Sequence, residues 1–197
     1  MRIVFFIKSA SVYLKNFSIK DIPGSSGRLD VISRCILAAL LRKDRFETKV
    51  KIWVFLDNYE TLIFDPESFN YDNFPKNEIK FTGHLVDILL KRNTDIEKNP
   101  LQFVQIANVS ILKSINEFMQ MGFTPYVLKE EGFDFFAHKD DINKRSNLLF
   151  IIGSQKDDFL DSEELLKLNI PTLSIGNQSY LASSVIRLLK LTLIELQ

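Results

Sequence analysis

The chain has 197 residues, of which 46% are hydrophobic and 25% are charged, with 7 glycines and 6 prolines. This composition indicates a globular protein with a hydrophobic core and excludes fibrous and disordered classes. The single cysteine excludes an intramolecular disulfide, and the apolar run "IVFFI" near the N-terminus is too short for a signal sequence or a membrane span. We therefore expect one soluble, cytoplasmic domain over residues 1–197.

The formal net charge is zero, but the charges are unevenly distributed along the chain. Residues 1–53 contain 11 Lys and Arg against 4 Asp and Glu, whereas the remainder contains 14 against 21, so the two parts carry +7 and −7. If the basic residues share a face, that face can hold phosphate groups. The alternative is a set of scattered, solvated side chains, and charge alone does not decide between the two.

Apolar runs and their periodicity predict the secondary structure. Runs rich in Ile, Val, Phe and Leu predict strands or short hairpins at residues 2–7, 50–56, 78–83, 126–136 and 147–153. Helical spacing predicts helices at residues 28–43, 84–93, 108–122 and 160–169. The acidic, aromatic stretch 57–77 predicts an irregular excursion. Strands that alternate with helices predict an α/β fold with a largely parallel sheet.

The C-terminal third contains two strands that both end in Ile-Gly, at Gly153 and Gly176, before a long closing helix. In a parallel sheet the loops after such strands lie at the carboxyl edge, where ligands bind in α/β folds. Two glycines would allow a flat ligand such as adenine to approach the main chain, whose N–H and C=O groups could read its edges. The alternative is that each glycine only makes a turn.

The stretch "IPGSSGRLDVISRC" (22–35) places a pliable loop before an Arg-x-Asp pair and an apolar helix. A loop with a serine N-cap accounts for the glycines and serines. It does not account for Arg28 and Asp30. A guanidinium group at the start of a helix is unfavourable to the helix dipole, so Arg28 is better explained by pairing with Asp30 or with a bound phosphate or carboxylate.

The longer stretch "SIKDIPGSSGRLDVISRC" resembles the N-terminal motif of the archaeal tRNA pseudouridine N(1)-methyltransferases, which are small SPOUT-class enzymes. That motif is a Lys-Asp-Leu-Pro-Gly-Ser run that leads into Gly-Arg-Leu-Asp and a helix carrying Arg-Cys. Further on, "IKFTG" (79–83) looks like a family strand ending in glycine, "FIIG" (150–153) like its first cofactor loop, and "LSIGNQSYLASSVI" (173–186) like its second cofactor loop and closing helix. Only residues 94–124 match poorly.

The resemblance implies a SPOUT-type fold, a Rossmann-like parallel sheet with a deep C-terminal trefoil knot, which is an exception to the rule against knots. It implies S-adenosylmethionine as the cofactor, a homodimer through the knot helices, and neither a metal nor a membrane. The residues implied to bind the cofactor are Ile152, Gly153, Leu173, Ser174, Ile175, Gly176 and Leu181. Ala182 would help Leu181 to close the far side of the site.

The implied reaction is methylation of N(1) of pseudouridine in the T-loop of tRNA, at position 54. Asp30 is the candidate general base for the N(1) proton, and Arg28 would orient that carboxylate, hold a target phosphate or favour the developing uracil anion. The base would be extruded from its loop to reach the cofactor. The candidates for contacts with the tRNA backbone are Lys8, Lys15, Lys20, Arg28 and Arg34.

The sequence also departs from the family pattern. Polar residues expected in the first loop are replaced by residues 154–157, a proline in the second loop by Asn177, and side chains of the closing helix by Leu181, Ser183 and Ser184. Three alternatives therefore stay open: a drifted paralogue that binds RNA or cofactor without turnover, a ribosomal RNA pseudouridine N(1)-methyltransferase, and a generic nucleotide-binding module. The last has no phosphate-loop or dinucleotide motif in its favour.

The closing helix predicts a second interface, because its apolar positions spread too widely round the helix for one core contact. These positions are Leu181, Val185, Ile186, Leu188, Leu189, Leu191, Leu193 and Ile194. Cys35, inside an apolar helix, is expected to pack in the core rather than to act as a nucleophile. Two isolated histidines predict no metal site.

Overall fold

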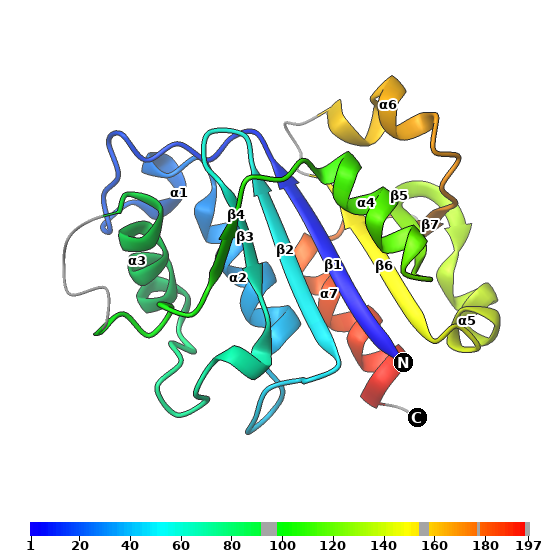
Figure 1. Ribbon diagram of the computed structural model, residues 1–197, viewed down its shortest axis with the longest axis horizontal. Helices are drawn as coiled ribbons and strands as arrows, with labels where there is room; N and C mark the ends of the chain where they lie inside the picture. The colour runs from blue at the N-terminus through cyan, green and yellow to red at the C-terminus, as the bar shows by residue number, and fades with distance from the viewer. Residues whose placement is uncertain (92–97, 154–157, 177, 196–197) are drawn as a thin grey trace.

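The computed structural model describes residues 1–91, 98–153, 158–176 and 178–195. Its centre is a seven-stranded sheet in the order β4-β3-β2-β1-β6-β5-β7 (Figure 1). The strands are β1 (Arg2–Ser9), β2 (Val50–Leu56), β3 (Thr61–Phe64), β4 (Gln105–Ala107), β5 (Thr124–Asp134), β6 (Asn147–Ile152) and β7 (Thr172–Ser174). β1 lies in the middle of this sheet.

The pairing directions confirm the predicted α/β class with a largely parallel sheet. β1 pairs in parallel with β2 and β6, and β5 pairs in parallel with β6 and β7. β3 and β4 run antiparallel at one edge. The irregular excursion predicted for residues 57–77 is wrong for Thr61–Phe64, which form β3. A strand of four residues that are all buried has no polar alternation to mark it.

Helices cover both faces of the sheet (Figure 1). They are α1 (Ile22–Ser25), α2 (Leu29–Leu40), α3 (Glu78–Leu89), α4 (Ile111–Gln120), α5 (Phe135–Asn143), α6 (Glu163–Leu166) and α7 (Ala182–Lys190). Short turns of other helical types cover Pro66–Ser68, Asp158–Asp161 and Leu191–Glu195. Within the described residues, no helix is long and apolar enough to cross a membrane.

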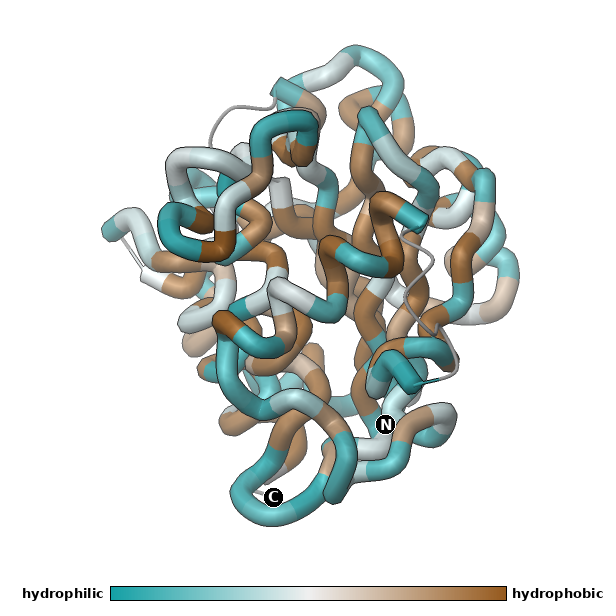
Figure 2. Tube along the Cα trace, turned by 90° about the vertical axis from the view of Figure 1, so that its left-hand side faces the viewer, coloured by the Kyte–Doolittle hydropathy of each residue, from teal (hydrophilic) through white to brown (hydrophobic). Residues whose placement is uncertain are grey.

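Alternation along β1 divides the core between the two faces. Ile3, Phe5 and Ile7 pack with α2, α3 and α7, whereas Val4 and Phe6 pack with α4 and α6. The apolar segments accordingly gather in the interior of the chain trace, and polar segments form the outer turns (Figure 2). The central strand is therefore buried on both faces, which is typical of a parallel sheet.

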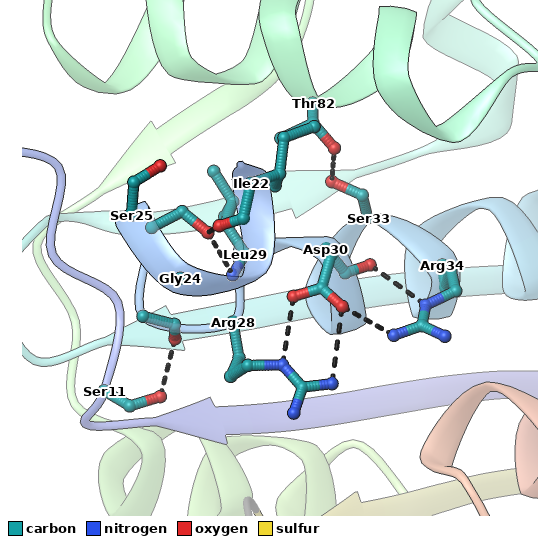
Figure 3. A network of polar contacts seen from close by, with 12 residues as sticks. Ser11, Ile22, Gly24, Ser25, Arg28, Leu29, Asp30, Ser33, Arg34 and Thr82 are labelled. Carbon is teal, nitrogen blue, oxygen red and sulfur yellow. Dashed lines mark hydrogen bonds and ion pairs between the residues drawn. The ribbon is translucent and has the colours of Figure 1, made fainter. Parts of the chain in front are cut away.

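The strand predicted at residues 78–83 is wrong, because these residues form the first half of α3. The side chain of Asn77 caps this helix and accepts hydrogen bonds from the N–H groups of Ile79 and Lys80 at 3.0 and 3.2 Å. Gly83 therefore lies inside a helix instead of at the end of a strand. A buried hydrogen bond of 2.8 Å from Thr82 of α3 to Ser33 joins this helix to α2 (Figure 3).

Candidate functional site

A cavity of about 750 Å³, which we call the main cavity, opens at the carboxyl edge of the parallel strands. Its walls are the ends of β5, β6 and β7 with the segments that follow them, the start of α7, and Arg28 from the N-terminus of α2. Ser9 and Ser11, at the end of β1, complete the lining. The volume is in the range of ordinary small-molecule sites, which is about 300–1,000 Å³.

The structure brings every predicted cofactor residue into this cavity. Ile152 and Gly153 come from the end of β6, Leu173 to Gly176 from β7 and its loop, and Leu181 with Ala182 from the start of α7. Tyr180, which is 48% exposed, lies in the same wall. Residues that are 20 to 30 positions apart in the sequence therefore share one lining, because parallel strands end at one edge of the sheet.

The two Ile-Gly loops differ in why they need glycine. Gly176 has φ 147°, a conformation that other residues rarely adopt. Its N–H and C=O groups are both engaged by the Ser174 hydroxyl, at 3.2 and 2.7 Å, so Ser174 fixes this loop. A Cβ atom on Gly153 would lie 2.7 Å from the side chain of Leu160, which lines the same cavity. Gly176 is thus needed for its backbone conformation, and Gly153 for close packing beside the cavity.

A third loop that sequence reasoning missed comes from β5. Leu128 and Phe133 both pair with Leu173 of β7, so residues 129–132 form a bulge, of which 129–131 line the main cavity. A Cβ atom on Gly132 would lie 2.7 Å from the main chain of Leu173, so only glycine fits this close approach. The signal in the sequence is the charged run "KEEG", which interrupts an apolar strand.

The charges in the main cavity are segregated. Among the described residues, the β5 bulge and the segment after β6 contribute four carboxylates, from Glu130, Glu131, Asp158 and Asp161. Lys129 offsets one of them, because its ammonium lies 2.6 Å from the Asp161 carboxylate. Among the described residues of the lining, the other cation is the Arg28 guanidinium, on the side of α2. The cavity therefore suits a ligand with an apolar body and positive charge on the side of β5 and β6.

Arg28, Asp30 and Arg34 form one network at the N-terminus of α2 (Figure 3). Arg28 donates to the two carboxylate oxygens of Asp30, through Nε at 3.1 Å and a terminal nitrogen at 3.4 Å. Arg34, one helical turn later, donates to Oδ2 of Asp30 at 2.6 Å. The Asp30 side chain is only 5% exposed, whereas the side chain of Arg28 is 48% exposed. Asp30 is thus held behind Arg28, which faces the main cavity.

Arg28 adopts a left-handed backbone conformation, with φ 71° at the N-cap of α2. Such a conformation costs a non-glycine residue roughly 1–3 kcal/mol, so the surroundings must fix it. Gly27 precedes it with φ 60°, and a Cβ atom there would lie 1.7 Å from the carbonyl oxygen of Ser11. The Ser26 hydroxyl accepts a hydrogen bond from the N–H of Leu29 at 3.0 Å. Together these contacts pack the loop before α2 against the chain that follows β1, and they orient Arg28 towards the main cavity.

The predicted RNA-binding residues fall into three places. Arg28 and Arg34 are joined through Asp30, as described above. Lys15 and Lys20 are exposed in the loop before α1. Lys8 forms an ion pair with Asp57, and its side chain is 12% exposed. By the alternation of β1 it points to the sheet face opposite Arg28, so the structure does not bring Lys8 together with the others.

Cys35 and the possible metal ligands show no sign of a catalytic role among the described residues. Burial raises the pKa of the Cys35 thiol to about 12, although the charge of Arg34 opposes this shift. This thiol is neutral and packed in the core, as predicted. In the parts of the chain that the structure describes, no three His, Cys, Asp or Glu side chains cluster as a metal would require. The substituted residues 154–157 and Asn177 lie outside the described residues.

The sequence matches, over residues 1–197, the family described as "Putative SAM-dependent RNA methyltransferase". One curated relative, the tRNA (pseudouridine(54)-N(1))-methyltransferase of Thermococcus onnurineus, is 28% identical over 192 residues, which cover 92% of each chain. The protein of the same name from Pyrococcus abyssi is 29% identical over 196 residues, which cover 93% of each chain.

A solved structure shares the fold. It is the crystal structure of Archaeoglobus fulgidus Nep1 bound to S-adenosylhomocysteine, with a TM-score of 0.68 at 17% identity, covering 99% of this chain and 98% of that chain. This similarity shows that the two chains share their overall fold, whereas the predicted trefoil knot stays a prediction. With the opening motif, the strand-end loops and the family match along its whole length, the chain belongs to the SAM-dependent RNA methyltransferases.

Proposed function

We propose that this protein methylates N(1) of pseudouridine at position 54, in the T-loop of tRNA, with S-adenosylmethionine as the methyl donor. The observation that carries the proposal is the main cavity, which joins Arg28 of the opening motif to the β5 bulge and to the segments after β6 and β7. The names and coverage of the relatives support the choice of substrate. We place the activity in the cytoplasm and assign it to the whole chain as one domain.

The residues of the main cavity fit S-adenosylmethionine. When bound, this molecule would supply an electrophilic methyl carbon, which is bonded to a positively charged sulfur and would be transferred to N(1). Ile152, Leu173 and Leu181 offer apolar surface to its uncharged parts. Glu130 and Glu131, on the β5 bulge, match its positive charges.

Arg28 is the side chain that we assign to the reacting base. It lines the main cavity, is half exposed and carries a fixed positive charge. As the N(1) proton leaves, negative charge develops on the uracil ring, and a preorganised guanidinium group stabilises this charge. Arg28 therefore lowers the barrier electrostatically.

Asp30 holds Arg28 in place. A general base needs a carboxylate oxygen that faces the substrate, whereas both oxygens of Asp30 accept hydrogen bonds from guanidinium groups. We therefore assign Asp30 as a positioning residue, with the proton passing to water. The pH dependence of the rate distinguishes this role from that of a general base.

We assign the RNA contacts to exposed basic residues and the contact between two copies to the closing helix. We assign contacts with the tRNA backbone to Arg34, Lys15 and Lys20, whose side chains are partly or fully exposed. We further propose the C-terminal trefoil knot and a homodimer through α7. Several apolar side chains of this helix and its ends are not fully buried. Val185 and Leu188 are partly buried, and Leu181 and Leu191 are 55% and 41% exposed.

The test is methyl transfer to a defined tRNA. A tRNA with pseudouridine at position 54 is incubated with the protein and methyl-deuterated S-adenosylmethionine, and its nucleosides are analysed by mass spectrometry. We expect one deuterated methyl group on N(1) of pseudouridine. The matched control carries uridine at position 54, whose N(1) is bonded to ribose and cannot accept a methyl group.

Two other results would replace the proposal. Tight binding of S-adenosylmethionine by calorimetry without product on either tRNA would identify a paralogue that has lost turnover. Product on a ribosomal RNA fragment with pseudouridine, and none on tRNA, would identify a ribosomal enzyme instead.

A further inference from the structure

A second cavity, of about 470 Å³, lies at the other end of the helix pair α2 and α7. Among the described residues, six basic side chains line it against one carboxylate, that of Glu78, which leaves a formal excess of five positive charges in this lining. We call it the basic pocket; its cations are Arg34, Arg42, Lys43, Lys76, Arg187 and Lys190. This concentration is unexpected in a chain whose formal net charge is zero.

Three of these cations have structural partners. Arg34 bonds Asp30, and Arg42 lies 3.5 Å from the buried carboxylate of Glu47. Lys190, only 4% exposed, donates to the carbonyl oxygens of Ala38, at 2.7 Å, and Leu41 at the end of α2. An ammonium group there compensates the negative end of the α2 dipole, so the floor of the pocket is not acidic.

The rim of the basic pocket carries cations that are available to a ligand. Lys43 and Arg187 are exposed, and no carboxylate among the described residues pairs with either of them. Lys76 lies over the ring of Tyr71, with its nitrogen 4.1 Å from the ring centre. Two unpaired cations and a third held by a ring face the same concavity. Such an arrangement attracts an anion, and phosphate is the anion for which arginine and lysine clusters are typical.

The basic pocket is connected to the main cavity through the same two helices. Arg28 lines the main cavity, Arg34 lines the basic pocket, and Asp30 bonds both of them. On α7, Ala182 lines the main cavity and Arg187 the basic pocket. A helix of the length of α2 extends about 18 Å, so the two cavities are separated by a few nucleotides of an RNA strand.

We propose that the basic pocket binds backbone phosphates of the RNA substrate while the target base occupies the Arg28 side of the main cavity. The inference rests on the proposed function, since it takes the substrate to be RNA. The carboxylates of the main cavity repel phosphate, and the basic pocket attracts it. The backbone is therefore directed along α2 and α7, away from the β5 and β6 loops.

The test uses the salt dependence of tRNA binding by the full-length protein, measured by fluorescence anisotropy between 50 and 300 mM KCl. We expect Lys43→Ala and Arg187→Ala each to weaken binding and to reduce the slope of log K against log salt by about 0.7–0.9, as for one lost phosphate contact. Lys113→Ala is the matched control, because it removes one exposed cation from α4 on the opposite face of the sheet. Its slope should equal that of the wild type.

The outcomes distinguish RNA binding in the basic pocket from a contact between two copies and from binding of free phosphate. Unchanged slopes in the Lys43→Ala, Arg187→Ala double variant, with normal circular dichroism, would overturn it. So would a change in mass by light scattering without a change in slope, since the pocket would then be an interface between copies. Binding of inorganic phosphate alone, with tRNA slopes unchanged, would also reject it. A reduced slope in a protein that fails to methylate the position 54 substrate would retain the pocket and refute only the proposed function.

Discussion

The side chain of Asp30 is almost fully buried and forms ion pairs with the guanidinium groups of Arg28 and Arg34. If Asp30 positions Arg28, Asp30→Asn removes the negative charge that holds the Arg28 guanidinium group. We expect kcat to fall about 10²-fold because this group is then no longer oriented towards the reacting base. The affinity for S-adenosylmethionine should stay within about threefold, since Asp30 does not line the main cavity. Single-turnover kinetics and calorimetry measure the two quantities.

The pH–rate profile distinguishes the two roles of Asp30. A positioning residue leaves the shape of the profile unchanged in Asp30→Asn, with the whole curve lowered. If the acid limb of the wild-type profile disappears in the variant, Asp30 is the base and our assignment is wrong. Arg28→Lys is the companion variant, because lysine keeps the positive charge but cannot donate two parallel hydrogen bonds to Asp30. We expect kcat to fall in this variant while the acid limb of the pH–rate profile is retained.

Alanine substitutions at Gly83 and Gly27 should have opposite effects on stability, because the two glycines lie in different secondary-structure elements. Gly83 lies inside α3, and a Cβ atom there meets only Ile19, at 3.9 Å. We expect Gly83→Ala to raise the free energy of unfolding by about 0.5–1 kcal/mol, because alanine loses less backbone entropy in a helix. Denaturant unfolding followed by circular dichroism measures this change.

Gly27 provides the comparison for Gly83. With φ 60° and a carbonyl oxygen 1.7 Å from the position of a Cβ atom, Gly27→Ala should destabilise the protein and disorganise the loop that carries Arg28. Equal effects of the two substitutions would contradict the assignment of residues 78–83 to a helix.

The closing helix gives a prediction about assembly. Leu191→Gln replaces an exposed apolar side chain by a neutral one, so the charge of the basic pocket does not change. Losing about 1 kcal/mol of burial in each copy of a two-fold interface should raise the dimer dissociation constant about 30-fold. Light scattering across a concentration series checks this. Met121→Gln, 63% exposed beyond the end of α4, is the control that should leave the mass unchanged.

The elements show what the sequence could predict. α2 and the strands β1, β2 and β6 carry long apolar patterns, and their places follow from periodicity. The alternation of Ile79 and Phe81 predicts a strand where α3 begins, and Asn77, a strong N-cap, is the signal for the helix instead. β4 is a three-residue edge strand, too short to show a period.

The candidate site was predictable where one segment contains it and not where the fold assembles it. The Arg28–Asp30 pair and both Ile-Gly loops are contiguous motifs. The basic pocket takes side chains from residues 34–43, 76–78 and 187–191, which only the packing of α7 beside α2 brings together. The β5 bulge depends on the register against β7, which no local pattern encodes.

At the scale of the whole molecule, Cys35 makes stability depend on pH. Burial raises its pKa from 9.0 to about 12 in the folded state, whereas the unfolded chain ionises near 9. Above pH 9 the unfolded state therefore binds fewer protons, and stability present below that pH is lost at about 1.4 kcal/mol per pH unit as pH rises towards 12. Urea unfolding between pH 8 and 10.5 should show this slope in the wild type relative to Cys35→Ala. Parallel curves for the two proteins would mean that the thiol ionises while folded.

The position of β1 in the sheet has a consequence for synthesis on the ribosome. This strand is the first to emerge, yet one of its two neighbours, β6, begins at Asn147. At about 5–20 residues per second, roughly 7–30 s pass before that partner is available. During this interval the apolar run "IVFFI" has an unpaired side that can template association with other nascent chains. Folding yield should therefore depend on how well chaperones shield the growing chain until β6 pairs with β1.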